Sequence, residues 1–408
     1  MAEKVNKPQI RFEGFTDAWE QRKLGEVANL LTGFPFESKK FVREGIKLVR
    51  GMNVKRGYLD FSEELCEYWS SSQGLENYLL NSGDILIQMD GALIGKSYAK
   101  IKENQLPALL VQRVTRVRIQ NQIADESFVY QQIQKGFLTY IKGTKTETAV
   151  PHLSLNDIES FEIATPSVDE EKKIGAFFES LDHLIILHQR KYDKLQILKK
   201  AMLEKMFPKN GSSVPEIRFK GFTDAWEQRK LGEVADIYDG VHQTPIYTDS
   251  GIMFLSAENI GTLKSSKYIS EEAFNRDYKV YPQKGDILMT RIGDVGTPNV
   301  VETSERVAFY VSLALLKPRN VESYFLCNSI LSPFFQSGLK ERTLNTAIPK
   351  KINKDEIGNV SLFLPHSTNE QMQIGGFFKQ LNALITLHQQ KLDTLKRLKK
   401  AMLGKMFV

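Results

Sequence analysis

The chain has 408 residues, of which 41% are hydrophobic and 25% are charged. This composition is that of a folded globular protein with two or three domains, and it excludes a disordered polypeptide. No run approaches the roughly 18 apolar residues of a transmembrane helix, and the N-terminal residues lack the apolar core of a signal peptide. We therefore expect a cytoplasmic protein that does not contact a membrane.

Two segments of the sequence occur twice. Residues 10–28 read IRFEGFTDAWEQRKLGEVA, and residues 217–235 repeat them with a single difference. Residues 183–207 and 383–407 are identical at 17 of 25 positions. A period of about 200 residues is far longer than a solenoid repeat, so the chain is a tandem duplication of whole domains.

The segments between the repeated ends differ, sharing little beyond a Gly-Asp-Ile-Leu run that begins at Gly83 and at Gly285. Short β-rich and helical runs alternate between turns, which predicts a compact α+β domain in each half. The expected strands are 84–88, 111–119 and 307–316, and the expected helices are 127–140 and 324–339. Constant ends around unlike middles indicate a scaffold that presents two different surfaces.

The repeated tails are predicted to form long helices. Apolar residues recur every three or four positions over 181–206 and 381–406, which places one apolar stripe on each helix. Residues 167–170 and 368–371 fit capping boxes, and the first helix should end near Phe207. Roughly 35 residues make each helix about 50 Å long. Since neither stripe has another obvious cover, we expect the helices to pair antiparallel.

Positive charge is concentrated in these tails. The net charge is +6, but residues 188–207 and 388–407 together carry +9. Lysines such as Lys199 and Lys399 could contact phosphate or a protein partner, or remain solvated. The expected organisation is a first domain at 1–165, a long helix at 166–208, a linker at 209–215, a second domain at 216–364 and a second long helix at 365–408.

These features resemble the specificity subunits of type I restriction-modification systems over essentially the whole chain. The matching segments are 19–28 and 226–235, which open the two variable domains, and the Pro, Glu-Gln, Ile and long-helix pattern that closes each half. The second copy fits this pattern with Pro365, Glu370, Gln371, Ile374, Phe377 and Phe378. The first copy has Pro166, Glu170 and Ile174, but Glu171 stands where the family has Gln.

The resemblance implies two target recognition domains joined by two long antiparallel helices with pseudo-twofold symmetry. Each domain would read one half of a bipartite site in double-stranded DNA, while the helices set the spacing. It further implies two methyltransferase (modification) subunits docked on the helices, and restriction/translocase subunits. S-adenosylmethionine, ATP and Mg²⁺ would belong to those partners, with no cofactor bound by this chain. A free-standing sequence-specific DNA-binding regulator is the alternative.

The sequence offers no catalytic residues of its own. The run Gly91 to Ser97 resembles a phosphate-binding loop, but it is one residue too short and leads into a predicted strand rather than a helix. No Asn-Pro-Pro-Tyr methylase tetrad occurs. Asp182, His183 and His188 are not a metal site, because the second copy replaces the first histidine by Ala383. We expect neither catalysis nor a bound metal.

DNA contact is expected from clusters of basic and amide side chains in both middles, since such groups bind phosphates and base edges. In the first domain the candidates are Lys39, Lys40, Arg50, Asn53, Lys55, Arg56, Gln88, Lys96, Gln112, Arg113, Lys145 and Thr146. In the second domain they are His242, Gln243, Thr244, Asn259, Arg291, Arg342, Thr343, Asn345, Lys350 and Lys351. For any one of them a solvated surface position is the competing interpretation.

Overall fold

The computed structural model describes residues 7–91, 94–144 and 152–408. The chain forms two compact units. The first unit comprises Met1–His188 and Lys391–Val408, and the second unit comprises Gln189–Gln390. Each unit therefore holds one α+β domain together with the first part of one long helix and the last part of the other.

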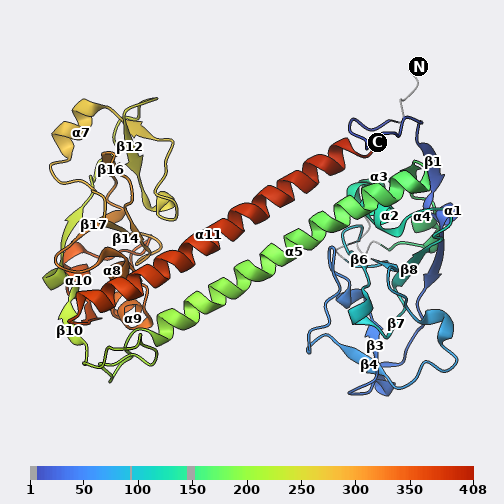
Figure 1. The fold of residues 1–408 in the computed structure, drawn as a ribbon, viewed down its shortest axis with the longest axis horizontal. Helices are drawn as coiled ribbons and strands as arrows, with labels where there is room; N and C mark the ends of the chain where they lie inside the picture. The colour runs from blue at the N-terminus through green and yellow to red at the C-terminus, as the bar shows by residue number, and fades with distance from the viewer. Residues whose placement is uncertain (1–6, 92–93, 145–151) are drawn as a thin grey trace. The chain divides into compact units, whose positions relative to one another are not determined.

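The strands of the first unit are β1 (Glu20–Lys23), β2 (Ala28–Thr32), β3 (Ile46–Val49), β4 (Glu67–Trp69), β5 (Ile85–Gln88), β6 (Tyr98–Lys100), β7 (Ala108–Leu110), β8 (Val114–Ile119) and β9 (Glu162–Thr165). They form a four-stranded sheet in the order β2-β8-β5-β6 and a three-stranded sheet in the order β4-β3-β7 (Figure 1). Strand β1 pairs antiparallel with β9, which ties the start of the domain to its end.

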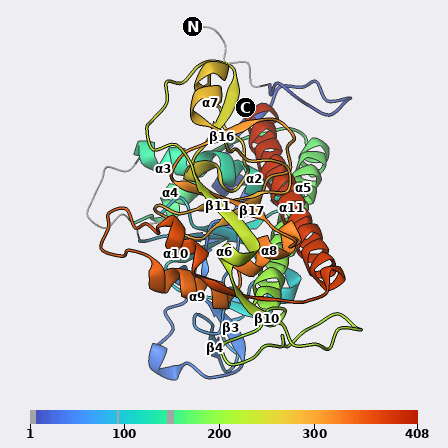
Figure 2. The same cartoon turned by 90° about the vertical axis from the view of Figure 1, so that its left-hand side faces the viewer.

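The strands of the second unit are β10 (Glu227–Lys230), β11 (Ala235–Asp239), β12 (Ile252–Leu255), β13 (Tyr268–Ile269), β14 (Ile287–Thr290), β15 (Pro298–Val300), β16 (Val307–Phe309), β17 (Leu313–Pro318) and β18 (Ser361–Leu364). The sheets are β11-β17-β14-β15, β13-β12-β16 and the pair β10-β18. Figure 2 faces this unit and labels β10, β11, β16 and β17. Strand for strand, the order in these sheets repeats that of the first unit. The unlike middles therefore share one topology.

Short helices cover these sheets. In the first unit they are α1 (Leu24–Val27), α2 (Glu126–Gln132), the π-helical η5 (Ile133–Phe137), α3 (Leu138–Thr144), α4 (Leu155–Glu159) and the 3₁₀ turns η1 (Ser38–Lys40), η2 (Gly51–Asn53), η3 (Glu76–Tyr78) and η4 (Glu103–Gln105). In the second unit they are α6 (Leu231–Val234), the 3₁₀ turn η6 (Ala257–Asn259), α7 (Glu271–Asp277), α8 (Ser323–Ile330), α9 (Pro333–Arg342) and α10 (Lys354–Gly358). The helix predicted at 127–140 is confirmed by the continuous run from α2 to α3.

Three predicted elements need correction. The strand expected at 307–316 is two strands, β16 and β17, separated by a turn at residues 310–312. The strand expected at 111–119 begins only at Val114, because Arg113 has a φ of 69° and breaks the extended backbone. The helix expected at 324–339 is two helices, since Pro333 starts a new one at its first position, capped by Ser332.

The shared Gly-Asp-Ile-Leu run has a structural role in both units. Asp84 accepts a hydrogen bond from the Asn81 backbone N–H at 2.7 Å and forms an ion pair with Arg118 of β8 at 2.7 Å. Asp286 accepts in the same way from Gln283 and pairs with Lys317 of β17. The aspartate thus closes the turn before the strand and fixes the neighbouring strand beside it.

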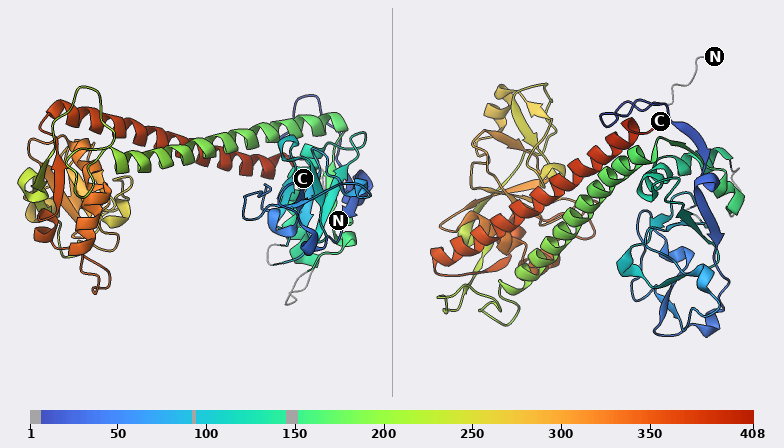
Figure 3. Two further views of the ribbon diagram at one scale, coloured as in Figure 1. Left: turned by 90° about the horizontal axis from the view of Figure 1, so that it is seen from below. Right: turned by 45° about the vertical axis from the view of Figure 1, so that its right-hand side comes forward.

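The two long helices are α5 (Val168–Lys205) and α11 (Thr368–Lys405). Within each unit a segment of one runs beside a segment of the other in the opposite direction (Figure 3). In the first unit, for example, Lys399 of α11 forms an ion pair with Asp182 of α5 at 2.6 Å. The predicted antiparallel pairing and the predicted end near Phe207 are therefore confirmed. At 1.5 Å per residue each helix is about 57 Å long.

The repeated segments meet where these helices begin. Arg11 donates through Nε and Nη2 to both carboxylate oxygens of Glu170, at 2.9 and 2.6 Å. Arg218 holds Glu370 in the same bidentate way, at 2.6 and 2.9 Å. The predicted capping boxes are thus wrong in detail. In the first box Glu170 binds Arg11 rather than the start of α5. In the second box the cap of α11 is Ser367, not Thr368, and Gln371 hydrogen-bonds to Glu322 and Pro365.

The end of each long helix is buried in the unit that holds the start of the other. Phe407, beyond the end of α11, packs against Trp19 in the core of the first unit, with ring centroids 6.0 Å apart. Phe207, beyond α5, packs against Trp226 in the second unit, also at 6.0 Å. The repeated opening and closing segments are therefore complementary halves of one core.

Candidate nucleic-acid interface

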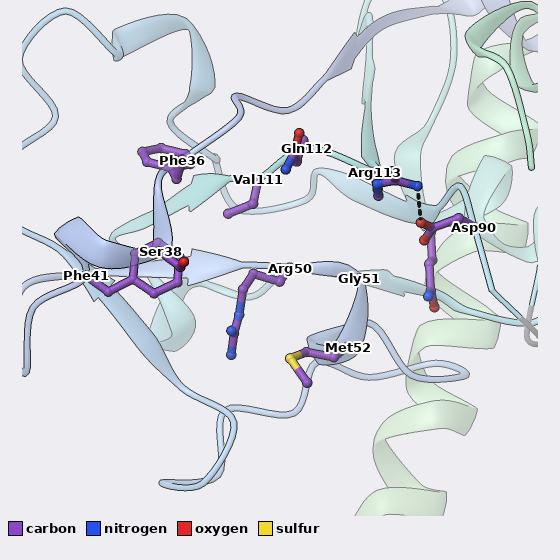
Figure 4. A pocket seen from close by; sticks show the side chains of 11 residues that line it. Phe36, Ser38, Phe41, Arg50, Gly51, Met52, Asp90, Val111, Gln112 and Arg113 are labelled. Carbon is purple, nitrogen blue, oxygen red and sulfur yellow. Dashed lines mark hydrogen bonds and ion pairs between the residues drawn. The ribbon is translucent and has the colours of Figure 1, made fainter.

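A hollow of about 410 Å³ opens on the domain of the first unit. Its lining comes from the region of η1, from η2, from the end of β5 and from the turn between β7 and β8 (Figure 4). The lining residues are Phe36, Ser38, Phe41, Arg50, Gly51, Met52, Gln88, Asp90, Val111, Gln112 and Arg113. Four of the predicted DNA-contacting residues, far apart in sequence, are therefore gathered around one depression.

Two backbones approach each other closely at Val111, one of the lining residues of this hollow. A Cβ atom at Gly33 would overlap the Val111 carbonyl, so only glycine allows the chain leaving β2 to cross the chain leaving β7. Gly240 crosses the backbone of Phe309 and Tyr310 in the same way in the second unit. The same crossing therefore shapes both domains.

Arg50 is held in place by the protein rather than free in solvent. Its Nη2 donates to the Leu65 carbonyl at 2.8 Å, and its guanidinium lies 5.9 Å from the centroid of the Phe41 ring. Glu67 lies 3.8 Å from Nη1, a loose ion pair. The cation is therefore pre-oriented at the edge of the hollow, as a phosphate-binding or guanine-binding arginine requires.

Gln88 and Gln112 bring two amide groups to the hollow. Gln88 ends β5 and Gln112 is exposed in the turn that follows β7. Among the described residues neither side chain has a hydrogen-bond partner, which leaves donors and acceptors for a ligand. Arg113 beside them pairs with Asp90 at 2.7 Å but remains largely exposed. Amides of this kind can pair with the N6 and N7 edge of adenine in the major groove.

Two of the predicted contact residues are structural. Asn53 is fully buried: its Nδ2 donates to the carbonyls of Asp60 and Leu65, and its Oδ1 accepts from the Arg50 N–H. Asn259, at the equivalent place in η6, accepts from the Ser256 N–H at 2.9 Å and donates to the Lys264 carbonyl at 3.0 Å. Their amides hold loops together. Asn53 is buried and is not presented for DNA, whereas Asn259 is partly exposed and its contact with DNA stays a prediction.

The other candidates of the first domain are spread over its surface. Lys39 and Lys40 are exposed on η1, where Lys40 pairs with Glu37 at 2.8 Å. Lys55 and Arg56 lie in the turn after η2, and Lys96 is exposed in the turn before β6. Lys145 and Thr146 lie outside the described residues.

Arg291 in the second domain was expected to contact DNA, but the structure buries its side chain. It is 7% exposed, its Nε donates to the Ile352 carbonyl at 3.1 Å, and its Nη1 pairs with Asp239. Asp239 ends β11 and precedes the loop 240–250, whereas Ile352 follows the loop 344–351. The side chain of Arg291 is therefore buried, where the prediction requires an exposed group, and it ties the bases of two loops together.

Those two loops carry most of the remaining candidates. His242, Gln243 and Thr244 are exposed in the loop 240–250, and Asn345, Lys350 and Lys351 are exposed in the loop 344–351. Arg342 at the end of α9 lies 3.7 Å from Glu356, and the hydroxyl of Thr343, the next residue, donates to the Leu339 carbonyl at 2.7 Å. Because Arg291 joins the bases of these two loops, the candidates in 240–250 and in 344–351 lie on neighbouring loops.

The apolar residues that line the hollow were not singled out from the sequence. Phe36, Phe41 and Met52 line the hollow between the polar groups, and Met52 is 49% exposed. The available signal was the interleaving of aromatic and apolar residues with the basic stretch 39–56. Such interleaving is typical of surfaces that bind bases as well as phosphates.

The glycine-containing run at Gly91 and the residue Asp182 have structural roles. The run at Gly91 forms a turn closed by the Ile94 N–H bonding to the Gly91 carbonyl at 3.2 Å, and the strand β6 follows. Residues 92 and 93 of that run lie outside the described residues. Asp182, which precedes His183 in sequence, accepts a hydrogen bond from Lys399.

Comparison with known proteins identifies the family. The model of the type I restriction modification DNA specificity domain matches residues 16–197 and again residues 223–397. The specificity subunit of the MjaVIII type I restriction enzyme from Methanocaldococcus jannaschii is 22% identical over 95% of this chain and 91% of its own. The EcoBI specificity subunit from Escherichia coli is 24% identical over 90% of this chain and 80% of its own.

A solved structure has the same fold. The S subunit of a type I restriction-modification system from M. genitalium superposes with a TM-score of 0.65 at 14% identity, covering 98% of this chain and 99% of that one. Among the described residues, none of the helices combines the length and hydropathy that crossing a lipid bilayer requires. The relatives favour a specificity subunit over a free-standing regulator. The chain therefore belongs to the type I restriction-modification DNA specificity family, as a non-catalytic specificity subunit with two target recognition domains that assembles with other subunits.

Proposed function

We propose that the hollow of the first domain and the paired loops of the second domain each read one half of a bipartite site in double-stranded DNA. The observation that carries this proposal is the convergence of Arg50, Gln88 and Gln112 on one depression. Arginine and glutamine pair bidentately with guanine and adenine edges, respectively. In the second domain the readers are the exposed polar residues of the loops that Arg291 joins.

We further propose that the long helices dock two methyltransferase subunits, to which restriction/translocase subunits then bind. Supporting this, Leu184 and Leu187 of α5 and the equivalent Leu384 and Leu387 of α11 remain 38–46% exposed. Two equivalent apolar strips suit two copies of one partner. S-adenosylmethionine, ATP and Mg²⁺ would act in these partners.

The proposal is tested by mapping methylated sites. The chain is co-expressed with its modification subunits, co-purification is measured, and the modified sequences are read genome-wide. Replacing Gln88 and Gln112 together by Ala should relax the sequence of one half-site and leave the other unchanged. Gln73→Ala, an exposed glutamine outside the hollow, is the matched control. Unchanged specificity in the double variant would contradict the assignment of the hollow.

A further inference from the structure

Two isoleucines stand out on the surface of the second domain. Ile348 is 99% exposed and Ile246 is 89% exposed, the highest values among the large hydrophobic side chains of the described residues. Single exposed apolar residues are common on proteins and by themselves carry no meaning. These two, however, occupy the two loops that also carry the polar residues proposed to read DNA.

Backbone hydrogen bonds fix both loops at their bases, and the isoleucine side chains at their tips point into solvent. The loop of Ile348 is closed by the Leu344 N–H bonding to the Lys351 carbonyl at 2.8 Å, and Lys350 accepts from the Gly293 N–H at 2.8 Å. The loop of Ile246 is closed at Thr248, which donates to the Tyr268 carbonyl at 2.9 Å.

The surroundings of Ile348 select a polyanion as its partner. Lys350 and Lys351 follow within three residues, both are exposed, and neither forms an ion pair within the described part of the chain. The two cations call for an anionic partner, and the match to a DNA specificity domain makes DNA the one proposed here. An apolar tip beside these cations matches DNA, where phosphates flank the apolar surfaces of the bases.

We propose that Ile348 is a specificity-determining residue that contacts a base of the second half-site through its apolar surface. This inference rests on the proposed function, because it requires the two loops to face DNA. The apolar surface of a base is available either as the thymine methyl group in the major groove or as the face of a base at an opened step. Both contacts bury the apolar side chain against a base. The methyl contact leaves the duplex stacked, whereas the contact with a base face requires an opened step.

The test uses the full assembly with its modification subunits and a duplex carrying the wild-type site. Ile348→Thr keeps the β-branched shape but adds a hydroxyl, and Ile348→Val keeps the apolar tip. Because Ile348 is almost fully exposed, neither change opens a cavity, and both variants should keep the wild-type Tm. Val214→Thr, at an exposed valine in the linker, is the matched control.

We expect Ile348→Thr to weaken binding about tenfold, because a hydroxyl replaces the apolar ethyl branch, and Ile348→Val and Val214→Thr to bind like wild type. Two DNA series distinguish the sources. If deoxyuridine in place of one thymine weakens wild type but not Ile348→Thr, the methyl group is the contact. If 2-aminopurine at one step brightens with wild type but not with Ile348→Thr, the side chain opens that step.

Unchanged binding by Ile348→Thr would overturn the inference while leaving the proposed function intact. Weaker binding with neither DNA response would also overturn it, since the tip would then meet sugar or phosphate. Loss of the modification subunits from Ile348→Thr would assign the tip to a protein contact instead. A wild-type assembly that shows no sequence preference would contradict the proposed function itself.

Discussion

Glu171 and Gln371 occupy equivalent positions near the starts of α5 and α11, and each accepts a hydrogen bond from the backbone N–H that begins a neighbouring helix. Glu171 Oε2 accepts from the Asp125 N–H at 2.7 Å, and Gln371 Oε1 accepts from the Glu322 N–H at 3.0 Å. Gln371 also donates through Nε2 to the Pro365 carbonyl at 3.0 Å. The second oxygen of Glu171, which takes the place of that Nε2, is buried without a partner among the described residues.

This difference makes Glu171 a proton-binding group near neutral pH. Burial raises the pKa of Glu171 from 4.5 to about 8, although the Asp125 N–H opposes the shift. The folded protein therefore holds a proton here that the unfolded chain releases between these values. This stabilisation is fully present below the unfolded pKa and is lost as pH rises through about 8.

We predict that Glu171→Gln removes this pH dependence, because glutamine carries no titrating proton and can donate as Gln371 does. Near pH 5 the variant and wild type should unfold at similar denaturant concentrations. At pH 9 the variant should be more stable by roughly 3 kcal/mol. Chemical unfolding across this pH range measures the difference, and parallel curves for the two proteins would refute it.

The second prediction concerns two adjacent glycines of α11. A Cβ at Gly375 would overlap the carboxylate of Glu322, which caps α8, whereas nothing lies within 4 Å of a Cβ at Gly376. Gly376→Ala should therefore stabilise the protein by about 0.5–1 kcal/mol, since alanine favours a helix, and the first copy already has Ala176 there. Gly375→Ala should destabilise by about 2 kcal/mol or more through lost capping and overlap. Thermal unfolding of the two variants should shift in opposite directions; a stabilising Gly375→Ala would show that the α8 cap can move at no cost.

The repeat made the scaffold predictable, because its constant ends carry a strong helical period and complementary core residues. The shared topology of the domains was not predictable, since a buried strand needs only apolar character and tolerates almost any apolar sequence. Within the candidate site, residue type indicated Gln88 and Gln112 as candidate contact residues, and the structure places both around the hollow. Residue type could not separate them from Asn53 and Arg291, whose burial depends on partners distant in sequence.

The third prediction follows from a repeated backbone contact. The Ile217 N–H bonds to the Lys205 carbonyl at 2.9 Å, and the Ile10 N–H bonds to the Lys405 carbonyl at 3.0 Å. Residues 206–216 link Lys205 covalently to Ile217, whereas no short segment links Lys405 to Ile10. A circular permutant that joins Phe407 to Ile10 through a copy of 208–216 and opens between Asn210 and Gly211 should fold and select the same DNA sites. Loss of cooperative unfolding in the permutant would show that the existing covalent junction is required.

The last prediction concerns the spacing between the half-sites. Two domains reading one duplex prefer half-sites about one helical turn apart, roughly 34–36 Å. Each long helix, at about 57 Å, is long enough to span that distance. An insertion after Leu198 alone should disrupt the packing of α5, because Leu195 and Met202 on either side of it both pack against the core of the second unit. Insertions that leave the contacts within each unit in place belong at the unit boundaries, after His188 in α5 and after Gln390 in α11.

If the helices set the spacing, four residues inserted at both points should lengthen the gap by one to two base pairs, because one turn adds about 5.4 Å and a base pair about 3.4 Å. The half-sites themselves should stay unchanged, since each domain keeps all of its own contacts. Sequencing the methylated sites of the double-insertion protein measures both features at once. Insertion into α5 alone is the matched control and should reduce activity, because it shifts one helix against the other. An active double-insertion protein that keeps the original gap would show that the helices do not set the distance.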